Sequence, residues 1–257
     1  GAGFFESSFD PLAINNPESG LKNIRARFKP DQFRKNLDLA GELSAGFLDK
    51  YQDSNVSAYR DFYDQTMRML RSKDLDAFDL SKEDKQTRER YGDSRFGQGC
   101  LLARRLVENG IRFVEVTSDG WDMHKDLKGE MEDICPPFDQ AYAALIADLK
   151  ERGLLDTTLV VLATEFGRKP KYEGDGRGHY PICFTCGLAG AGVKRGFVYG
   201  ASDAAGAQPD QPVTVGDFHA TIGWAAGLPI DKEAVTSSGR PFKIGGSKAK
   251  PILEMFS

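Results

Sequence analysis

The sequence has no long apolar run and no large excess of charge of either sign. Its longest strongly apolar run, Leu159 to Ala163, is far shorter than the ~20 residues that a membrane-spanning helix needs, so we expect no membrane span. The 34 Lys and Arg residues are balanced by 38 Asp and Glu residues, and they form no dense basic stripe. This balance argues against nucleic acid or an anionic membrane as the main partner.

Cysteine is scarce, and the common nucleotide and hydrolase motifs are missing. Four cysteines are too few for a disulfide scaffold, and their spacing fits no zinc module built from two CxxC pairs. Cys183 and Cys186 form one CxxC, but on a strand they would point to opposite faces, which favours two core residues. There is no P-loop and no GxSxG nucleophile elbow, and the glycines of Gly190 to Gly196 have the wrong spacing for a dinucleotide loop.

The composition is that of a globular chain. With 40% hydrophobic and 28% charged residues over 257 positions, the chain suits one large domain or two small ones. We expect residues 1–92 to form an extended lead-in followed by a helical segment, because turn formers interrupt the first 29 residues and apolar side chains at helical spacing begin at Pro30. A second helix is expected over Val56 to Leu70.

After residue 92, a helix, a glycine and an apolar strand follow one another twice. The first set comprises a helix over 94–109 and a strand over 111–117, and the second comprises a helix over 138–152 and a strand over 159–163. Such repeats are typical of parallel strands in an α/β sheet. We therefore predict for residues 93–257 an α/β core with a mostly parallel sheet flanked by helices. Further elements are expected as strands over 182–188 and 197–199 and a helix over 213–226.

Polar side chains gather in the loops next to these strands. Asp122 and His124 follow the first strand, Glu165 and Arg168 follow the second, and His179 ends the next loop. In open α/β sheets ligands bind beyond the carboxyl ends of the strands, so we expect these side chains to meet at one edge. Two carboxylates and two imidazoles can hold a divalent ion such as zinc or manganese. Arg168 and Arg177 beside them suit an anionic substrate.

This hypothesis has a geometric requirement and simpler alternatives. His179 precedes its strand, so it reaches the same edge only if the loop 169–179 stays there and the following strand runs antiparallel or is bent at its entry. Taken singly, a Glu after a strand is usually a cap or a solvated end, and the simpler interpretation of Arg168 and Arg177 is a surface salt bridge. The chain has only three histidines and two of them lie in these loops, which favours a joint role, whereas His219 is expected to pack on a helix face.

Several motifs in this order resemble a known family. They are Gly97 to Val116, Gly120 to His124, Arg152 to Val161, Glu165 to Arg168, Gly176 to Pro181, Leu188 to Lys194 and Val198 to Asp203. Together they resemble the family called domain of unknown function 1501, a sulfatase-like branch of the alkaline-phosphatase superfamily, over most of residues 90–245. The resemblance implies an alkaline-phosphatase-like fold and a metal-dependent hydrolase of sulfate or phosphate esters. The implied metal ligands are Asp122, His124, Glu165 and His179, with Arg168 offsetting developing negative charge.

Two departures from the family pattern bear on activity. Relatives often have Asp where this chain has Gly178. Superfamily enzymes carry an N-terminal strand with an acidic ligand and a nucleophile, and we expect that strand to lie upstream of the segment that matches Gly1. We therefore expect the chain to correspond to the C-terminal two-thirds of a family member, to hydrolyse esters poorly by itself, and to self-associate through an uncovered sheet edge. The resemblance implies a periplasmic or exported protein. The competing hypothesis is a noncatalytic binding or structural protein that keeps the fold.

Overall fold

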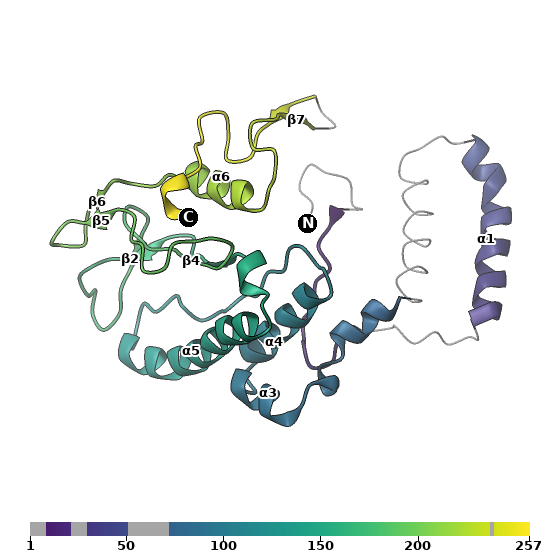
Figure 1. Cartoon of the computed structure of the whole chain (residues 1–257), viewed down its shortest axis with the longest axis horizontal. Helices are drawn as coiled ribbons and strands as arrows, with labels where there is room; N and C mark the ends of the chain where they lie inside the picture. Colours follow the sequence, from purple (N-terminus) through teal and green to yellow (C-terminus); the bar gives the residue numbers. More distant parts are fainter. Residues whose placement is uncertain (1–8, 22–29, 51–71, 237–238) are drawn as a thin grey trace. The chain divides into compact units, whose positions relative to one another are not determined.

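The structure, a computed structural model, describes residues 9–21, 30–50, 72–236 and 239–257 (Figure 1). The chain divides into two compact units, Gly1–Glu83 and Asp84–Ser257. All of the candidate site residues belong to the second unit.

The described residues of the first unit include one long helix. Helix α1 spans Pro30–Lys50, and a proline suits the first position because its φ is preset and its missing N–H needs no partner there. The predicted helix start at Pro30 is thus confirmed, whereas the helix expected over 56–70 lies outside the described residues. Two short 3₁₀ helices follow, η2 (Lys73–Phe78) and η3 (Leu80–Lys82).

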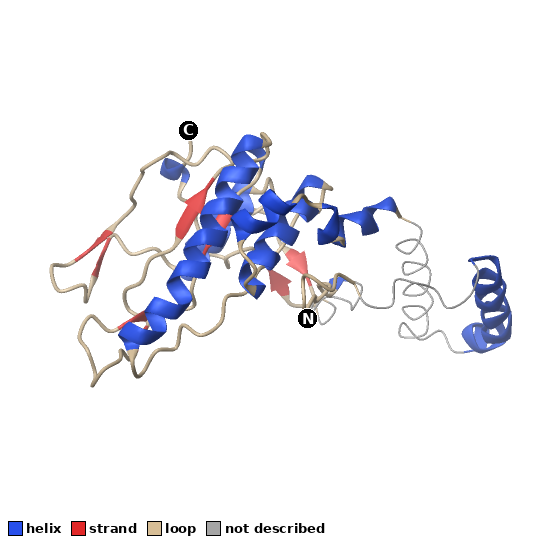
Figure 2. Cartoon of the chain, turned by 90° about the horizontal axis from the view of Figure 1, so that it is seen from below, coloured by secondary structure: helices blue, strands red, loops and turns tan. Residues whose placement is uncertain are grey.

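The second unit has four α-helices among its described residues (Figure 2): α3 (Lys85–Tyr91), α4 (Arg95–Glu108), α5 (Leu127–Glu151) and α6 (Val215–Ala225). Each helix begins after a residue whose side chain accepts a hydrogen bond from a backbone N–H of the first turn, namely Asp84, Ser94, Asp126 and Thr214. The sequence analysis assigned residues 85–91 to the N-terminal segment, and the structure packs them in the second unit against α4 and α5.

Glycine ends α4 and α5 as predicted. Gly110 and Gly153 have φ of 85° and 69°, a left-handed conformation that suits a residue without Cβ. In the structure α5 begins at Leu127 rather than at 138, and it runs through Pro136 and Pro137. The sequence analysis placed the start after these prolines, and proline does usually end or kink a helix.

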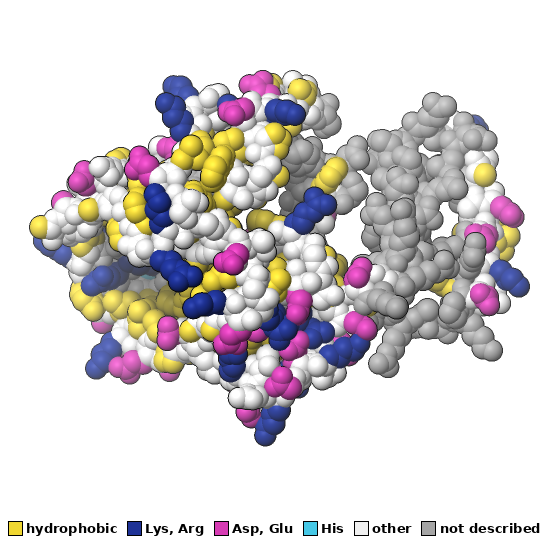
Figure 3. All heavy atoms as spheres, viewed as in Figure 1, with side chains coloured by type: hydrophobic (Ala, Val, Ile, Leu, Met, Phe, Trp, Pro, Cys, Tyr) yellow, Lys and Arg dark blue, Asp and Glu magenta, His cyan; other side chains and the backbone are white. Residues whose placement is uncertain are grey.

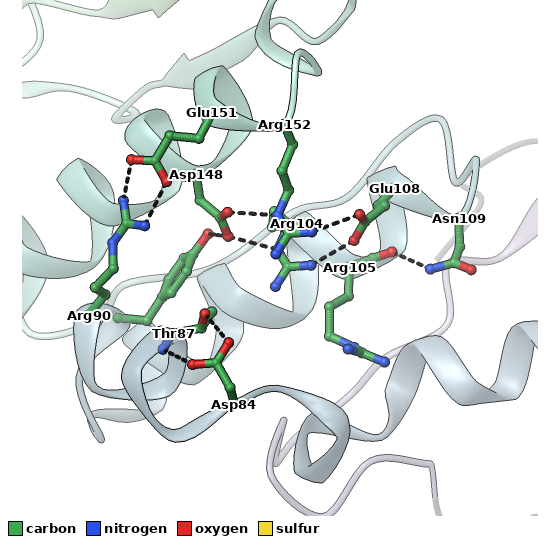
Figure 4. A network of polar contacts seen from close by, with 11 residues as sticks. Asp84, Thr87, Arg90, Arg104, Arg105, Glu108, Asn109, Asp148, Glu151 and Arg152 are labelled. Carbon is green, nitrogen blue, oxygen red and sulfur yellow. Dashed lines mark hydrogen bonds and ion pairs between the residues drawn. The ribbon is translucent and has the colours of Figure 1, made fainter.

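The core of the second unit lies between α3, α4 and α5. Its buried apolar side chains include Tyr91, Leu101, Leu102, Leu106, Ala141, Ala144 and Leu149. Charged side chains are buried with them. Arg104 on α4 is 0% exposed and pairs with Asp148 on α5 at 2.9 Å, and the Tyr91 hydroxyl donates to the same carboxylate at 2.9 Å (Figure 4). Buried charges of this kind need partners, so the network fixes how the two long helices pack.

Strands in the described residues form four two-stranded antiparallel pairs. They are β1 (Val160–Leu162) with β4 (Gly187–Ala189), β2 (Gly167–Arg168) with β3 (His179–Tyr180), β5 (Ala201–Ser202) with β6 (Pro209–Asp210), and β7 (Ala234–Val235) with β8 (Pro241–Phe242).

The strand pairing differs from the mostly parallel sheet predicted from the sequence, because the described residues contain no parallel pair. Residues 111–117 form no strand, and Phe113 within them is 79% exposed. A strand forms only where a neighbouring strand completes its hydrogen bonds, and residues 111–117 have none in the described chain. The alkaline-phosphatase-like architecture, and self-association through an open edge, stay predictions.

Charges of both signs lie on the surface, in agreement with the balanced composition. Basic and acidic side chains are interspersed over the face of the second unit drawn in Figure 3. No helix in the described part of the chain is long and apolar enough to cross a membrane, as the sequence analysis expected.

Candidate metal centre

The candidate ligands come from two segments of the second unit. Asp122 and His124 lie in the irregular segment just before α5, and His179 is the first residue of β3. Strands β2 and β3 run antiparallel, and Arg168 pairs in register with His179. The loop of residues 169–178 therefore begins and ends on the same side of this strand pair. The sequence analysis required this geometry for His179 to reach the other candidate ligands.

Backbone hydrogen bonds hold this loop against the segment that carries Asp122 and His124. The N–H of Arg177 donates to the carbonyl of Met123 at 3.0 Å, and the N–H of Leu127 donates to the carbonyl of Asp175 at 3.0 Å. Met123 is only 2% exposed, so it anchors its segment in the interior. The two ligand-bearing segments are thus joined by their main chains and not only by their side chains.

Three ligand atoms converge on one point. The Oδ1 atom of Asp122 lies 2.8 Å from Nε2 of His179 and 3.1 Å from Nε2 of His124, and the two Nε2 atoms lie 3.1 Å apart. The side chains are 65%, 48% and 52% exposed for Asp122, His179 and His124. The cluster is therefore open to solvent on one side.

Hydrogen bonds cannot satisfy all three contacts together. A neutral imidazole carries one N–H, so the two Nε2 atoms supply at most two protons when both rings are neutral. If both protons point at Asp122, the contact between Nε2 of His124 and Nε2 of His179 has no acceptor. A single cation among the three atoms would be attracted by all of their lone pairs at once, so the geometry favours a cation site.

The spacing of the cluster suits a transition metal. Zinc bonds to His nitrogen and carboxylate oxygen at about 2.0–2.2 Å, so two ligand atoms of a tetrahedral ion lie about 3.3 Å apart. The separations within the cluster, 2.8 to 3.1 Å, need only a small expansion to reach this value. Three protein ligands with an open side are typical of catalytic zinc sites, whereas structural zinc sites have four.

Arg168 completes the cluster with a positive charge. Its Nη2 donates to Oδ1 of Asp122 at 2.5 Å, and its Nη1 donates to the carbonyl of Arg177 at 3.2 Å. The hydrogen bond from Arg168, followed by that from His179, lowers the pKa of Asp122 to about 2. Asp122 is therefore ionised throughout the neutral range, which is the form that binds a metal.

Phe166 supports the cluster from one side. Its ring lies 4.4 Å from the His179 ring, tilted by 32°, and the Arg168 guanidinium carbon lies 5.7 Å from the centre of the same phenyl ring. The phenyl ring thus restricts the orientations of both polar side chains. The sequence analysis did not select Phe166, although its place between Glu165 and Gly167 within the predicted turn was a usable signal.

Glu165 is the predicted ligand that the structure does not bring into the cluster. It is exposed after β1, and the group of ligand atoms found among the described residues consists of Asp122, His124 and His179. Arg177 contributes its backbone to the site, while its guanidinium carbon lies 4.9 Å from the centre of the Tyr172 ring.

A family model described as "Protein of unknown function (DUF1501)" matches residues 1–256. The chain therefore belongs to the DUF1501 family. No curated protein and no solved structure matches the chain. Membership of the DUF1501 family carries no activity with it, so function has to be argued from the chemistry of the site.

Proposed function

We propose that this DUF1501 protein is a sulfatase-like, metal-dependent hydrolase of sulfate or phosphate esters, acting on a small anionic ester. The observation that carries the proposal is the convergence of Asp122, His124 and His179 on one point, with Arg168 bonded to the same carboxylate. Membership of the alkaline-phosphatase superfamily and a periplasmic or exported location belong to the same proposal and rest on the family resemblance.

The ligand set favours zinc or manganese over calcium, because two imidazole nitrogens accompany one carboxylate and calcium prefers oxygen ligands alone. When bound, the ion would polarise an ester oxygen and lower the pKa of bound water. Asp122 neutralises part of the charge of such an ion, and its own pKa of about 2 keeps it deprotonated while it does so.

Arg168 is the residue proposed to bind the anion. A guanidinium has five N–H groups, and the two hydrogen bonds to Asp122 and to the carbonyl of Arg177 fix its plane while leaving donors for an ester oxygen. A fixed donor next to a cation site is suited to negative charge that develops during ester cleavage.

The hydroxyl side chains that follow the two predicted strands, Ser118 and Thr164, are the candidates for a nucleophile. Thr164 donates its hydroxyl proton to the carbonyl of Phe166 at 3.0 Å, and the Ser118 hydroxyl accepts from the Trp121 indole at 2.9 Å. Both hydroxyl groups are thus engaged in local hydrogen bonds. We expect turnover by this chain alone to be weak, which keeps a noncatalytic anion-binding protein as the alternative.

The test is to measure metal-dependent anion binding and ester hydrolysis on the same protein. Chelator-treated protein is loaded with zinc or manganese, titrated with inorganic phosphate or sulfate, and assayed with an aryl phosphate and an aryl sulfate. Arg168→Ala is expected to abolish the anion binding, whereas Arg195→Ala, which removes an exposed arginine of another loop, should leave it unchanged. Hydrolysis lost in His124→Ala supports an enzyme, and metal-dependent binding without hydrolysis favours the binding protein. If Arg168→Ala keeps both anion binding and hydrolysis, the assignment of Arg168 as the anion-binding residue is wrong.

A further inference from the structure

Gly176 is buried in the loop between β2 and β3, three residues before His179. Its φ lies outside the left-handed range, so its backbone conformation is open to other residues. What the position lacks is space. A Cβ atom added there would meet the carbonyl carbon and oxygen of His124 far inside contact distance, and it would lie 2.6 Å from the backbone nitrogen of Lys125.

The atoms in the way belong to backbone and cannot rotate aside. An ordinary Cβ contact is 3.4–4 Å, so a side chain at 176 has to push the loop and the His124 segment apart. The two backbone hydrogen bonds that join these segments are made by neighbouring residues. The N–H of Arg177 donates to the carbonyl of Met123, and the N–H of Leu127 donates to the carbonyl of Asp175. At Gly176 the main chains that carry the two histidines thus approach too closely to admit a side chain.

We propose that Gly176 is a positioning residue of the metal centre, and that its missing side chain sets the separation at which His124 and His179 bind one ion. This inference rests on the proposed metal-dependent function. The two Nε2 atoms lie 3.1 Å apart, and metal–ligand distances tolerate deviations of only about 0.2 Å. A shift of the loop that is harmless to folding therefore suffices to weaken the site.

The same loop contains a matched control. Gly178 is also buried and also has a φ outside the left-handed range. The three atoms nearest to a Cβ added there all belong to side chains, namely the carboxylate end of Glu173 and Cδ of Lys169. Both are flexible ends at the surface that can move away. Gly178→Ala adds the same methyl group two residues along the loop without separating the two backbones.

The experiment is a zinc titration of chelator-treated wild type, Gly176→Ala and Gly178→Ala, in competition with a zinc indicator. We expect Gly176→Ala to bind zinc about 10- to 100-fold more weakly, the range found when supporting residues of metal sites are changed. Gly178→Ala should stay close to wild type. Equal affinity for Gly176→Ala and wild type, or equal losses in the two variants, would overturn the inference while leaving the proposed metal site in place.

A wild type that binds no zinc would overturn the proposed function, and the inference is then judged on metal-free protein. The chain has three histidines, so their ring signals are few in an NMR spectrum, with His219 on α6 as the reference. His124→Ala should shift the His179 ring signals in the wild-type background and leave them unmoved in the Gly176→Ala background. Equal shifts in both backgrounds overturn the positioning role.

A measurement on wild type alone covers the case in which Gly176→Ala does not fold. Zinc bound between the two histidines should slow hydrogen exchange at the amides of Arg177 and Leu127, because loop docking and metal binding stabilise each other. Unchanged exchange at both amides on zinc addition would contradict the inference.

Discussion

Removal of the Asp148 carboxylate should destabilise the second unit strongly. Arg104 and Asp148 pair at 2.9 Å with side chains that are 0% and 5% exposed. Breaking a buried pair by removing one partner costs about 3–5 kcal/mol, because the remaining charge stays buried. We expect Asp148→Ala to lower the free energy of unfolding by that amount. At about 2–4 °C per kcal/mol, the melting temperature should fall by about 6–20 °C.

The control lies one turn further along α5. Glu151 pairs with Arg90 at 2.8 Å, but its side chain is 59% exposed (Figure 4). Exposed pairs contribute about 0–1 kcal/mol, so Glu151→Ala should shift the melting temperature only slightly. Differential scanning calorimetry and urea denaturation of both variants measure the difference. Equal destabilisation by the two substitutions would refute the argument from burial.

A double substitution tests whether the buried charge is the cause. Arg104→Met with Asp148→Leu replaces the pair by apolar side chains, and such replacements are often neutral or stabilising. The double variant should therefore be more stable than Asp148→Ala alone. A double variant that is less stable would mean that packing, and not the loss of Asp148 as a partner of Arg104, dominates the effect of Asp148→Ala.

Three further predictions concern pH, backbone conformation and thiol reactivity. Burial raises the pKa of Asp148, but the hydrogen bonds from its arginine and tyrosine partners outweigh this and hold the pKa below 3.8. As the pH falls, the carboxyl group of Asp148 therefore takes up a proton in the unfolded chain before it does so in the folded protein, and stability is lost below about pH 3.8. In urea denaturation at several pH values, Asp148→Asn should reduce this loss. Gly190 has φ of 80° and a Cβ there would meet backbone carbonyls, whereas Gly153, with φ of 69°, has open space. In urea denaturation, Gly153→Ala should lower the free energy of unfolding by about 1–2 kcal/mol, and Gly190→Ala should lower it by more. Burial raises the pKa of the Cys100 thiol to about 12, so mass spectrometry of native protein treated with iodoacetamide should show Cys135 modified before Cys100.

Local signals in the sequence were sufficient for the ends of α4. Ser94 caps its first turn and Gly110 takes a left-handed conformation after its last, and each acts through atoms a few residues away. Strand pairing depends on distant residues, and here the pattern was misleading. Residues 111–117 alternate as a strand would, but alternation does not specify a partner, and none pairs with them in the described chain.

The site was partly accessible to the same reasoning. Asp122, His124 and His179 could be selected because their residue types and their places next to predicted strands suggested a metal. Glu165 was selected by the same rule, and the structure leaves it outside the cluster. The close approach at Gly176 was not predictable, because it depends on how two loops pack and no short-range pattern encodes it.

Zinc binding by the histidine variants tests the central claim most directly. Calorimetric titration of chelator-treated protein with zinc should give one tight site in wild type and in His219→Ala, because His219 lies on α6 and outside the cluster. His124→Ala and His179→Ala should each lose the site, since each removes one of three ligands. Wild-type affinity in His124→Ala or His179→Ala, or loss of the site in His219→Ala, would contradict the account.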